Sequence, residues 1–267
     1  MTEARPRSGA AVAVAVLGAN GRMGRAVVRL AHEAGMKIVC AIAAGDEGRD
    51  AGELAGIGPI GTMIGTDAAA LATSGAQVMI DFSAPVALLE AAGICASAGI
   101  AIVSGTTGLD DAASSALEQA AAKCAVLWEP NMSVGVHVLA SLVEKATAAL
   151  GASFDIEVVE VHHRAKVDAP SGTAIRLGDV VKNARGARYV NGREGRPGPR
   201  KQDEIGMHAI RGGDVIGDHT VFFFGDGERI ELTHRASSRD LFARGAVRAA
   251  AWIAGKAAGR YRLGDAL

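Results

Sequence analysis

The sequence predicts an α/β protein in two parts: a doubly wound parallel sheet, then a second α+β domain whose mixed sheet is mostly antiparallel. Three observations lead to this prediction. Short apolar runs alternate with helix-prone segments in the first half of the chain, which is typical of parallel β-α-β units. A glycine-rich loop directly follows the first run. In the second half, strand-like runs follow one another across short glycine turns, which favours antiparallel pairing.

Five apolar runs are predicted to be strands buried on both faces of the first sheet. They span residues 11–17, 37–43, 77–83, 101–107 and 125–131. The segments between them are rich in alanine and favour helices. We expect residues 1–9 to be a disordered tail rather than a secretion signal, because the first apolar run leads directly into the glycine-rich loop.

The loop after the first strand has the spacing GxxGxxG, from Gly18 to Gly24. Glycines allow a tight turn, and free N–H groups at the start of the next helix attract a pyrophosphate. In this position the loop predicts a Rossmann-like dinucleotide site, although a turn that binds nothing has the same spacing. The candidate cofactor-binding residues of the loop are Gly18, Ala19, Asn20, Gly21, Arg22 and Met23.

Polar or turn residues also follow three later strands of the first sheet. In an open α/β sheet, ligands bind beyond the carboxyl ends of the strands. A nicotinamide ring and its ribose could therefore lie against these loops. The candidate residues are Gly105, Thr106, Thr107, Glu129, Pro130, Asn131 and Met132.

The second domain is predicted to span residues 134–238, and the first to span residues 1–133. An apolar helical stripe over residues 134–151 opens the second domain. Strands are expected at "DIEVVEVHH", "EIGMHAIRG", "GDHTVFFFG" and "ERIELTHR", with the last three joined by hairpin turns. A C-terminal helix within residues 239–267 is expected to pack back on the first domain.

The stretch "VEVHHRAKVDAPSGTA", residues 159–174, is the most polar and irregular part of the second domain. His162 and His163 point to opposite faces at a strand end, and Lys166 can reach the same cleft. The N–H groups of Gly172 and Thr173 at the following helix start can bind an anion. The pattern therefore offers proton donors beside a carboxylate-sized cradle, with a capped turn and surface histidines as the alternative. No third ligand is spaced to complete a metal site.

Composition excludes several classes of function. The formal net charge is −1, so charge alone predicts neither nucleic-acid nor membrane-surface binding. The chain has no uninterrupted apolar stretch of the length that a membrane span needs. Its three cysteines lie in apolar segments, which indicates reduced, buried thiols and a cytoplasmic protein.

The run "EVVEVHHRAKVDAPSGTA" resembles the signature of the dihydrodipicolinate reductase family, also called 4-hydroxy-tetrahydrodipicolinate reductases. The segments "GANGRMG", "IDFS", "SGTTG", "EPNMSVGV", "GDVIGDHTV" and "THRASSRDLFARGAVRAA" follow in the family's order. The resemblance implies an NADPH- or NADH-dependent oxidoreductase of lysine and diaminopimelate biosynthesis. Its substrate would be a cyclic imine with two carboxylates, and its second domain would bind substrate and form a homotetramer.

The resemblance also assigns roles to residues. It makes His162 a proton donor and acceptor, His163 a substrate contact and Lys166 a proton donor. Gly172 and Thr173 would hold a substrate carboxylate. The glycine-rich loop and residues 105–107 and 129–132 would bind the nicotinamide cofactor.

The end of the second strand departs from the usual pattern. Dinucleotide folds place an acidic residue about 20 residues past the glycine loop, where it binds the adenosine ribose. This chain has Ala43 and Ala44 there, and the nearest acids, Asp46 and Glu47, lie further along a glycine-containing loop. We therefore expect NADPH to be used at least as well as NADH.

Two other functions are compatible with the pattern. One is another two-domain nicotinamide oxidoreductase of amino-acid metabolism. The other is a protein that senses a dinucleotide without turnover. A sensor would not require the HHxxK run beside an anion cradle, so the reductase is the main hypothesis.

Overall fold

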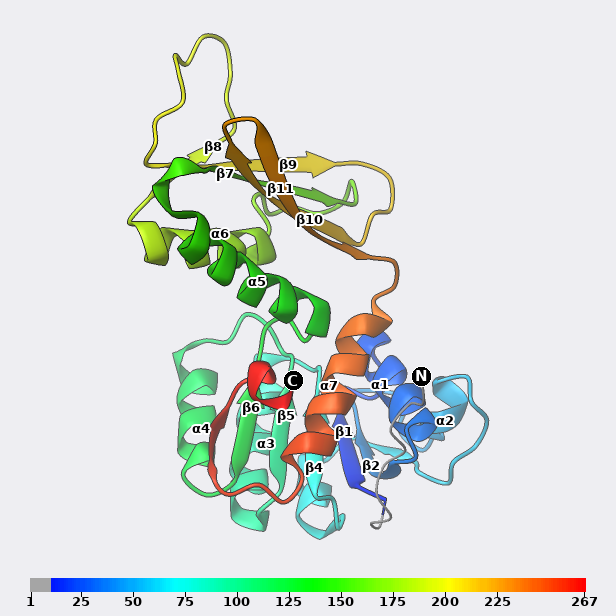
Figure 1. Cartoon of the computed structure of the whole chain (residues 1–267). Coiled ribbons are helices and arrows are strands. Elements are labelled where there is room, and N and C mark those ends of the chain that lie inside the picture. The colour runs from blue at the N-terminus through cyan, green and yellow to red at the C-terminus, as the bar shows by residue number, and fades with distance from the viewer. Residues whose placement is uncertain (1–10) are drawn as a thin grey trace, which may run out of the picture. The chain divides into compact units, whose positions relative to one another are not determined.

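The computed structural model describes residues 11–267, so the tail expected at residues 1–9 lies outside the described part. The chain divides into two compact units. Unit 1 contains the described residues up to Met132 together with Asp240–Leu267, and unit 2 contains Ser133–Arg239. Each unit has its own sheet and its own core (Figure 1).

Unit 1 is built on a seven-stranded sheet in the order β12-β6-β5-β4-β1-β2-β3. All of its pairings are parallel. The five predicted strands are present, and two short ones, β3 and β12, were not predicted. The strands are β1 (Ala13–Leu17), β2 (Lys37–Ile42), β3 (Ile64–Gly65), β4 (Val78–Asp81), β5 (Ala101–Ser104), β6 (Ala125–Trp128) and β12 (Gly259–Tyr261).

Helices pack against both faces of this sheet, which makes it the doubly wound sheet that the sequence predicts. One apolar cluster joins the sheet to α1 (Arg22–Glu33) and α7 (Asp240–Ile253). A second cluster joins the opposite strand residues to α3 (Pro85–Ala98) and α4 (Asp111–Ala121). The short helix α2 (Ala51–Leu54) and a 3₁₀ turn at Ala68–Thr73 lie in the connection between β2 and β4.

The C-terminal segment differs from the single helix that was expected within residues 239–267. Helix α7 ends at Ile253, and Gly255 adopts a φ of +78°, a conformation that glycine tolerates and that commonly ends helices. The chain then pairs β12 beside β6 and finishes in a 3₁₀ turn at Leu263–Ala266. The return to unit 1 therefore supplies both a helix and an edge strand.

Unit 2 contains a five-stranded sheet in the order β11-β10-β7-β9-β8. Strand β10 runs antiparallel to β7 and β11, whereas β9 runs parallel to β7 and β8. The sheet is therefore mixed, as expected, with more antiparallel than parallel residue pairs. Its strands are β7 (Asp155–His162), β8 (Arg188–Asn191), β9 (Glu204–Arg211), β10 (Gly217–Gly225) and β11 (Glu228–Ala236).

The predicted hairpin between β9 and β10 does not form, because both strands pair with β7, which lies between them. The connecting residues 212–216 cross the end of β7. Five extended residues reach about 16 Å, which exceeds the roughly 10 Å that separates strands two places apart. Only the turn between β10 and β11 is a hairpin.

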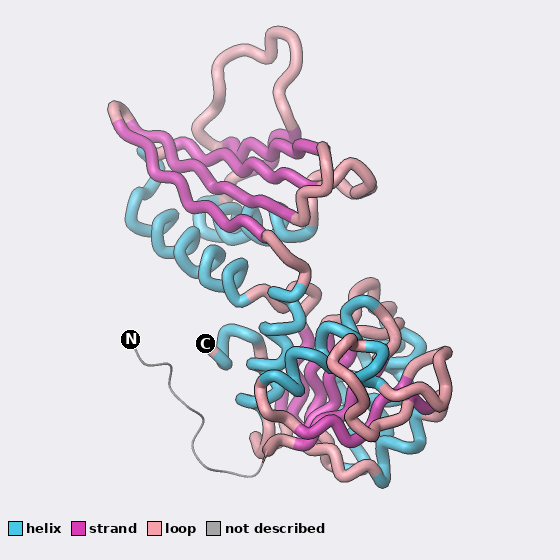
Figure 2. The backbone as a smooth tube through the Cα atoms, turned by 90° about the vertical axis from the view of Figure 1, so that its right-hand side faces the viewer, coloured by secondary structure: helices cyan, strands magenta, loops and turns pink. Residues whose placement is uncertain are grey.

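Helices α5 (Val134–Leu150) and α6 (Gly172–Arg185) cover one face of this sheet (Figure 2). The core beneath them includes Leu139, Val143, Leu177 and the fully buried Phe223. Helix α5 is long and apolar enough by composition to cross a membrane, but one side of it is part of this core. Not all apolar residues of α5 face the core, since Val138 and Leu142 are each 46% exposed.

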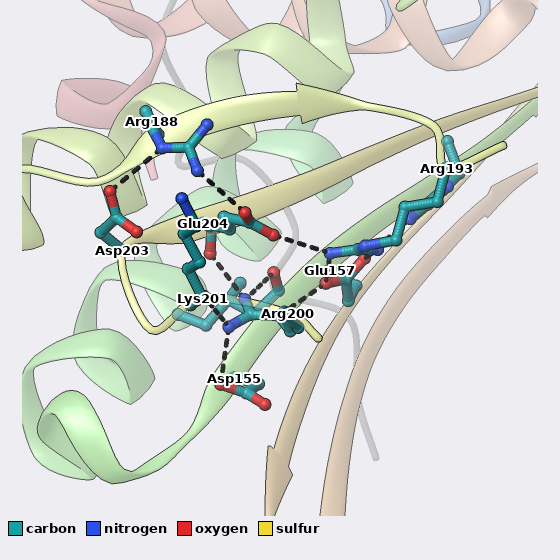
Figure 3. A network of polar contacts seen from close by, with 10 residues as sticks. Asp155, Glu157, Arg188, Arg193, Arg200, Lys201, Asp203 and Glu204 are labelled. Atoms are coloured by element: carbon teal, nitrogen blue, oxygen red, sulfur yellow. Dashed lines mark hydrogen bonds and ion pairs between the residues drawn. The ribbon is translucent and has the colours of Figure 1, made fainter. Parts of the chain in front are cut away.

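The other face of the unit 2 sheet carries a network of charges centred on Glu157 of β7 (Figure 3). Arg193 binds both carboxylate oxygens of Glu157, at 2.8 and 2.9 Å, and the Nε atom of Arg200 binds one of them at 2.9 Å. His208 Nε2 lies 2.7 Å from the same carboxylate. A Cβ on Gly206 would lie 1.7 Å from a Glu157 oxygen, so glycine makes room for the carboxylate.

The Glu157 network holds both ends of the loop between β8 and β9, which is the long yellow loop in Figure 1. Arg193 lies near its start and Arg200 near its end. Burial alone would raise the pKa of Glu157, but hydrogen bonds from Arg193, His208 and Arg200 outweigh it and hold the pKa at about 2. The carboxylate of Glu157, within the same unit, therefore holds both ends of this basic loop in place.

Gly24→Ala should destabilise unit 1 by about 3 kcal/mol, the upper end of the usual range for overpacking. The added Cβ would lie 2.0 Å from the carbonyl oxygen of Gly18. Gly93→Ala is the matched control, because Gly93 lies in α3 with nothing near its Cβ position. Alanine there should raise the free energy of unfolding by about 0.5–1 kcal/mol. Urea unfolding of both variants measures the difference, and equal midpoints would contradict the close approach.

Glu157→Gln should lower the free energy of unfolding at pH 7 by on the order of 3 kcal/mol. The pKa of Glu157 is depressed from 4.5 to about 2, so its contribution is complete above pH 4.5 and is lost as the pH falls towards 2. The difference between variant and wild type should therefore shrink over that interval. Thermal unfolding between pH 2 and 7 checks this, with the exposed Glu144→Gln as control. A difference that does not depend on pH would contradict it.

Candidate functional site

The glycine-rich loop lies where the order of strands in unit 1 reverses. From β1 the chain continues to β2 on one side, and it later returns to β4 on the other side of β1. Such a switch point is where ligands bind in open α/β sheets. No side chain caps α1, whose N-cap is Gly21, so N–H groups of its first turn remain available to an anion.

Close backbone packing explains the glycines of this region. Gly18 has a φ of +81°, and a Cβ there would lie 2.7 Å from the carbonyl oxygen of Phe82. A Cβ on Gly105 would lie 2.2 Å from the Phe82 ring. The loops after β1, β4 and β5 are therefore brought together, as expected for residues 18–23 and 105–107. A glycine-rich loop beside uncapped N–H groups fits the pyrophosphate of a dinucleotide.

Asp81, at the end of β4, organises this edge of the sheet. It is fully buried and accepts hydrogen bonds from the hydroxyls of Ser83 (2.5 Å), Ser104 (2.6 Å) and Thr106 (2.7 Å). Burial raises the pKa of Asp81, and these hydrogen bonds offset the increase only in part. The sequence analysis noted "DFS" as a strand end but did not identify this role of its aspartate.

The third loop with cofactor candidates, residues 129–132, follows β6. Glu129 and Met132 are buried. A Cβ on Gly245 of α7 would lie 1.8 Å from the carbonyl oxygen of Met132, so the returning helix packs closely on this loop. Trp128 Nε1 donates to the carbonyl oxygen of Thr106 at 2.8 Å, which joins the loop after β6 to the loop after β5.

In unit 2, the buried carboxylate of Glu160 holds the catalytic candidates together. His162 Nδ1 lies 2.5 Å from one of its oxygens. Arg211 donates to both oxygens at 2.7 Å, and the N–H of Ser171 donates at 3.0 Å. Burial alone would raise the pKa of Glu160, but the hydrogen bonds from Arg211 and His162 outweigh it and lower the pKa. The ionised carboxylate therefore fixes the proton on Nδ1 of His162 and leaves Nε2 for proton exchange.

Ser171 and His219 form the second layer of this site. The Ser171 hydroxyl caps α6 by accepting from the N–H of Ala174 at 3.2 Å. The same hydroxyl oxygen lies 3.0 Å from Nε2 of His219, and the tautomer of His219 decides which of the two donates. Burial, with a smaller effect from His162, lowers the pKa of His219 to about 4, so this histidine is neutral at pH 7. Sequence reasoning missed Glu160, Arg211 and His219, whose contacts join three strands.

Lys166 lies in the loop between β7 and α6, where its Nζ atom is 2.8 Å from Asp168 Oδ1. Arg211 reaches the same loop, since its Nη2 donates to the carbonyl oxygen of Asp168 at 2.6 Å. His163 and Thr173 are half-buried, and Gly172 is exposed at the helix start. Among residues 11–267, no group of three acidic, histidine or cysteine side chains is arranged to hold a metal ion.

The predicted residues thus form two groups. Unit 1 gathers the cofactor candidates at the carboxyl edge of its sheet. Unit 2 gathers His162 and the start of α6 around Glu160, and Lys166 pairs with Asp168 in the loop between them. The first group can bind a dinucleotide. The second offers proton donors and cations beside free N–H groups, which suits a substrate that carries carboxylates.

Sequence comparisons match both units to one family. Residues 12–132 match the N-terminal domain of dihydrodipicolinate reductase, and residues 135–267 match its C-terminal domain. The 4-hydroxy-tetrahydrodipicolinate reductase of Anaeromyxobacter sp. (strain Fw109-5) is 50% identical over 96% of this chain and 97% of its own length. The enzyme of the same name from Acinetobacter baumannii (strain AYE) is 46% identical over 97% of each chain.

A solved structure supports the fold. The dipicolinate-bound dihydrodipicolinate reductase from Paenisporosarcina sp. TG-14 aligns with a TM-score of 0.76 over 94% of this chain and 97% of its own, at 23% identity. At this identity the likeness concerns the fold alone, whereas the sequence matches cover both units. The chain therefore belongs to the 4-hydroxy-tetrahydrodipicolinate reductase family.

Proposed function

We propose that unit 2 reduces its substrate at the site around Glu160, with His162 and Lys166 as the proton-transferring groups. The family catalyses the NAD(P)H-dependent reduction of 4-hydroxy-tetrahydrodipicolinate in lysine and diaminopimelate biosynthesis. One observation carries the proposal: a single buried carboxylate binds His162, the α6 start and Arg211 together.

The substrate is a cyclic imine with two carboxylates, and the residues of unit 2 suit its charge. The N–H groups of Gly172 and Thr173 at the α6 start would bind one carboxylate. Lys166 would exchange its contact with Asp168 for the substrate, and His163 would add a further contact. These interactions position the ring before reduction.

The reduced nicotinamide supplies hydride when it is bound. Loss of the 4-hydroxyl group as water would form a conjugated C=C–C=N system in the substrate. Its reduction would place negative charge on the ring, which must then gain a proton. The ammonium group of Lys166 stabilises that charge and donates a proton. His162, with its Nδ1 proton fixed on Glu160, exchanges protons through Nε2.

In unit 1 we assign the nicotinamide and its ribose to residues 105–107 and 129–132, and the pyrophosphate to residues 18–23. The contacts of Asp81 support this assignment, because they hold the loop after β4 and the Thr106 hydroxyl together. Buried free cysteines at positions 40, 95 and 124 support a cytoplasmic location.

Assay of the purified protein with freshly generated 4-hydroxy-tetrahydrodipicolinate and each coenzyme tests the function directly. Loss of reduced-nicotinamide absorbance only in the presence of that substrate is the expected result. Turnover of a different aldehyde or hydroxy acid would favour another oxidoreductase, and coenzyme binding without turnover would favour a sensor.

His162→Ala and Lys166→Ala should each lower kcat by roughly 10²–10⁴, the usual range for a lost general acid or base. Lys166→Ala should keep the unfolding midpoint of the wild type, whereas His162→Ala should also lower it, because it removes one hydrogen-bond partner of the buried Glu160 carboxylate. The exposed His32→Ala and Lys145→Ala are matched controls in which kcat should not change. Near-normal kcat in both site variants would show that these residues serve only the local structure.

We also propose that four copies assemble through the sheet face of unit 2 that no helix of that unit covers. Ile210 of β9 is 51% exposed at one end of that face. Phe224 of β10 is 37% exposed at the other end, where it stacks on Phe222 with ring centroids 5.6 Å apart. Large exposed apolar side chains on a sheet face that no helix covers support an interaction surface. A second copy of the same face would bury them.

Light scattering should therefore give four times the 27.1 kDa mass of one chain. Ile210→Arg should dissociate the assembly, because a charge would be buried in the interface. The variant Val138→Arg, on the exposed side of α5, is the control and should keep the wild-type mass. A monomeric wild type would contradict the proposal.

A further inference from the structure

Asp46 follows β2 in unit 1 and turns back towards the glycine-rich loop. Its Oδ2 atom accepts a hydrogen bond from Nδ2 of Asn20 at 3.1 Å. Its Oδ1 atom lies 3.2 Å from Nη1 of Arg49. A carboxylate that the sequence analysis placed too far along the chain is therefore in contact with the loop that binds pyrophosphate.

The backbone of Asp46 shows how the side chain reaches this position. Its φ is +60°, and it is the only residue other than glycine with a positive φ within residues 11–267. Aspartate tolerates this left-handed conformation better than most residues, but it remains uncommon. The contacts with Asn20 and Arg49 hold the conformation. Asp46 also lies 22 positions after Gly24, close to the usual spacing of the ribose-binding acid.

We propose that Asp46 is the residue that binds the adenosine ribose hydroxyls and makes NADH the preferred coenzyme. The inference rests on the proposed dinucleotide site in unit 1. It replaces the expectation of equal or better use of NADPH, because that expectation assumed that no carboxylate reaches the glycine-rich loop.

The Asp46 carboxylate has capacity left for a ligand. A carboxylate offers about four lone-pair sites, and Asn20 and Arg49 each take one on a different oxygen. Its side chain is 29% exposed. The hydrogen bonds from Asn20 and then Arg49 lower its pKa, so it is ionised at neutral pH. An ionised acceptor makes stronger hydrogen bonds to hydroxyls than a neutral one.

A 2′-phosphate at the same place would meet this negative charge. Arg49 is already paired with Asp46, and the Nε atom of Arg25 is bound to the carbonyl oxygen of Asn20 at 2.8 Å. Arg49 can offset this repulsion only in part, because its charge is already paired with the carboxylate. The negative charge of Asp46 therefore favours the coenzyme that has a 2′-hydroxyl.

The test measures dissociation constants of NADH and NADPH by the fluorescence of the bound coenzyme, without substrate. The wild type should bind NADH at least about tenfold more tightly than NADPH, which corresponds to 1.4 kcal/mol. Asp46→Asn and Asp46→Gly should each reduce that ratio by about tenfold or more. Glycine suits the positive φ, so Asp46→Gly removes the carboxylate without straining the backbone.

Glu47→Gln is the matched control, since it removes the same charge from the next residue. Glu47 is exposed and accepts from the Thr66 hydroxyl at 3.3 Å, away from Asn20. In Glu47→Gln the ratio of the NADPH and NADH dissociation constants should stay at the wild-type value. Equal shifts in Asp46→Asn and Glu47→Gln would reduce the effect to general charge and overturn the proposal. So would a wild type that prefers NADPH, or one that binds neither coenzyme.

The binding measurement is independent of the catalytic proposal. A protein that binds NADH in this way but does not reduce 4-hydroxy-tetrahydrodipicolinate would contradict the proposed function and leave the role of Asp46 intact. A protein that turns over the substrate but binds both coenzymes with equal affinity would contradict the role of Asp46 and leave the proposed function intact.

Discussion

Unit 2 depends on one buried negative charge, the carboxylate of Glu160. An unpaired ion in that position would be strongly destabilising. The charge is tolerated because four hydrogen bonds from His162, Arg211 and Ser171 converge on it. Each partner belongs to a different segment of unit 2. The requirement to satisfy Glu160 therefore sets the orientation of a histidine ring, the start of a helix and the end of a strand together.

Unit 1 uses the same arrangement with neutral partners. Asp81 is also a carboxylate buried at a strand end, but hydroxyl groups rather than an arginine surround it. The two environments shift the pKa in opposite directions, upward for Asp81 and downward for Glu160. A cation close to the carboxylate therefore decides whether burial or hydrogen bonding dominates. In both units a short polar side chain on a strand, rather than the glycines alone, fixes the loops.

Much of the fold could be predicted from the sequence, because buried strands and amphipathic helices leave local patterns. For that reason the five longer strands of unit 1 and a cap at the start of α6 could be predicted. The pairing of β10 with β7 was not, since the turn residues before Gly217 do not show which strand lies beside it. The contact of Asp46 with the glycine-rich loop was not predicted for a similar reason. A single positive φ redirects its side chain, and the periodicity of a sequence does not indicate such a φ. The partners of Glu160 lie far apart in sequence and needed the structure.

The path of the chain has a consequence for how the protein is made. Unit 2 is inserted into unit 1, and α7 and β12 are the last elements to leave the ribosome. Until then one face of the parallel sheet lacks the helix that buries Ala246, Ala250 and Ile253 against it, and β6 remains an open edge. Uncovered apolar faces and unpaired edges favour aggregation. Unit 2 can complete its own core during synthesis, whereas unit 1 lacks α7 and β12 until unit 2 has been made, so unit 1 is exposed to aggregation for longer.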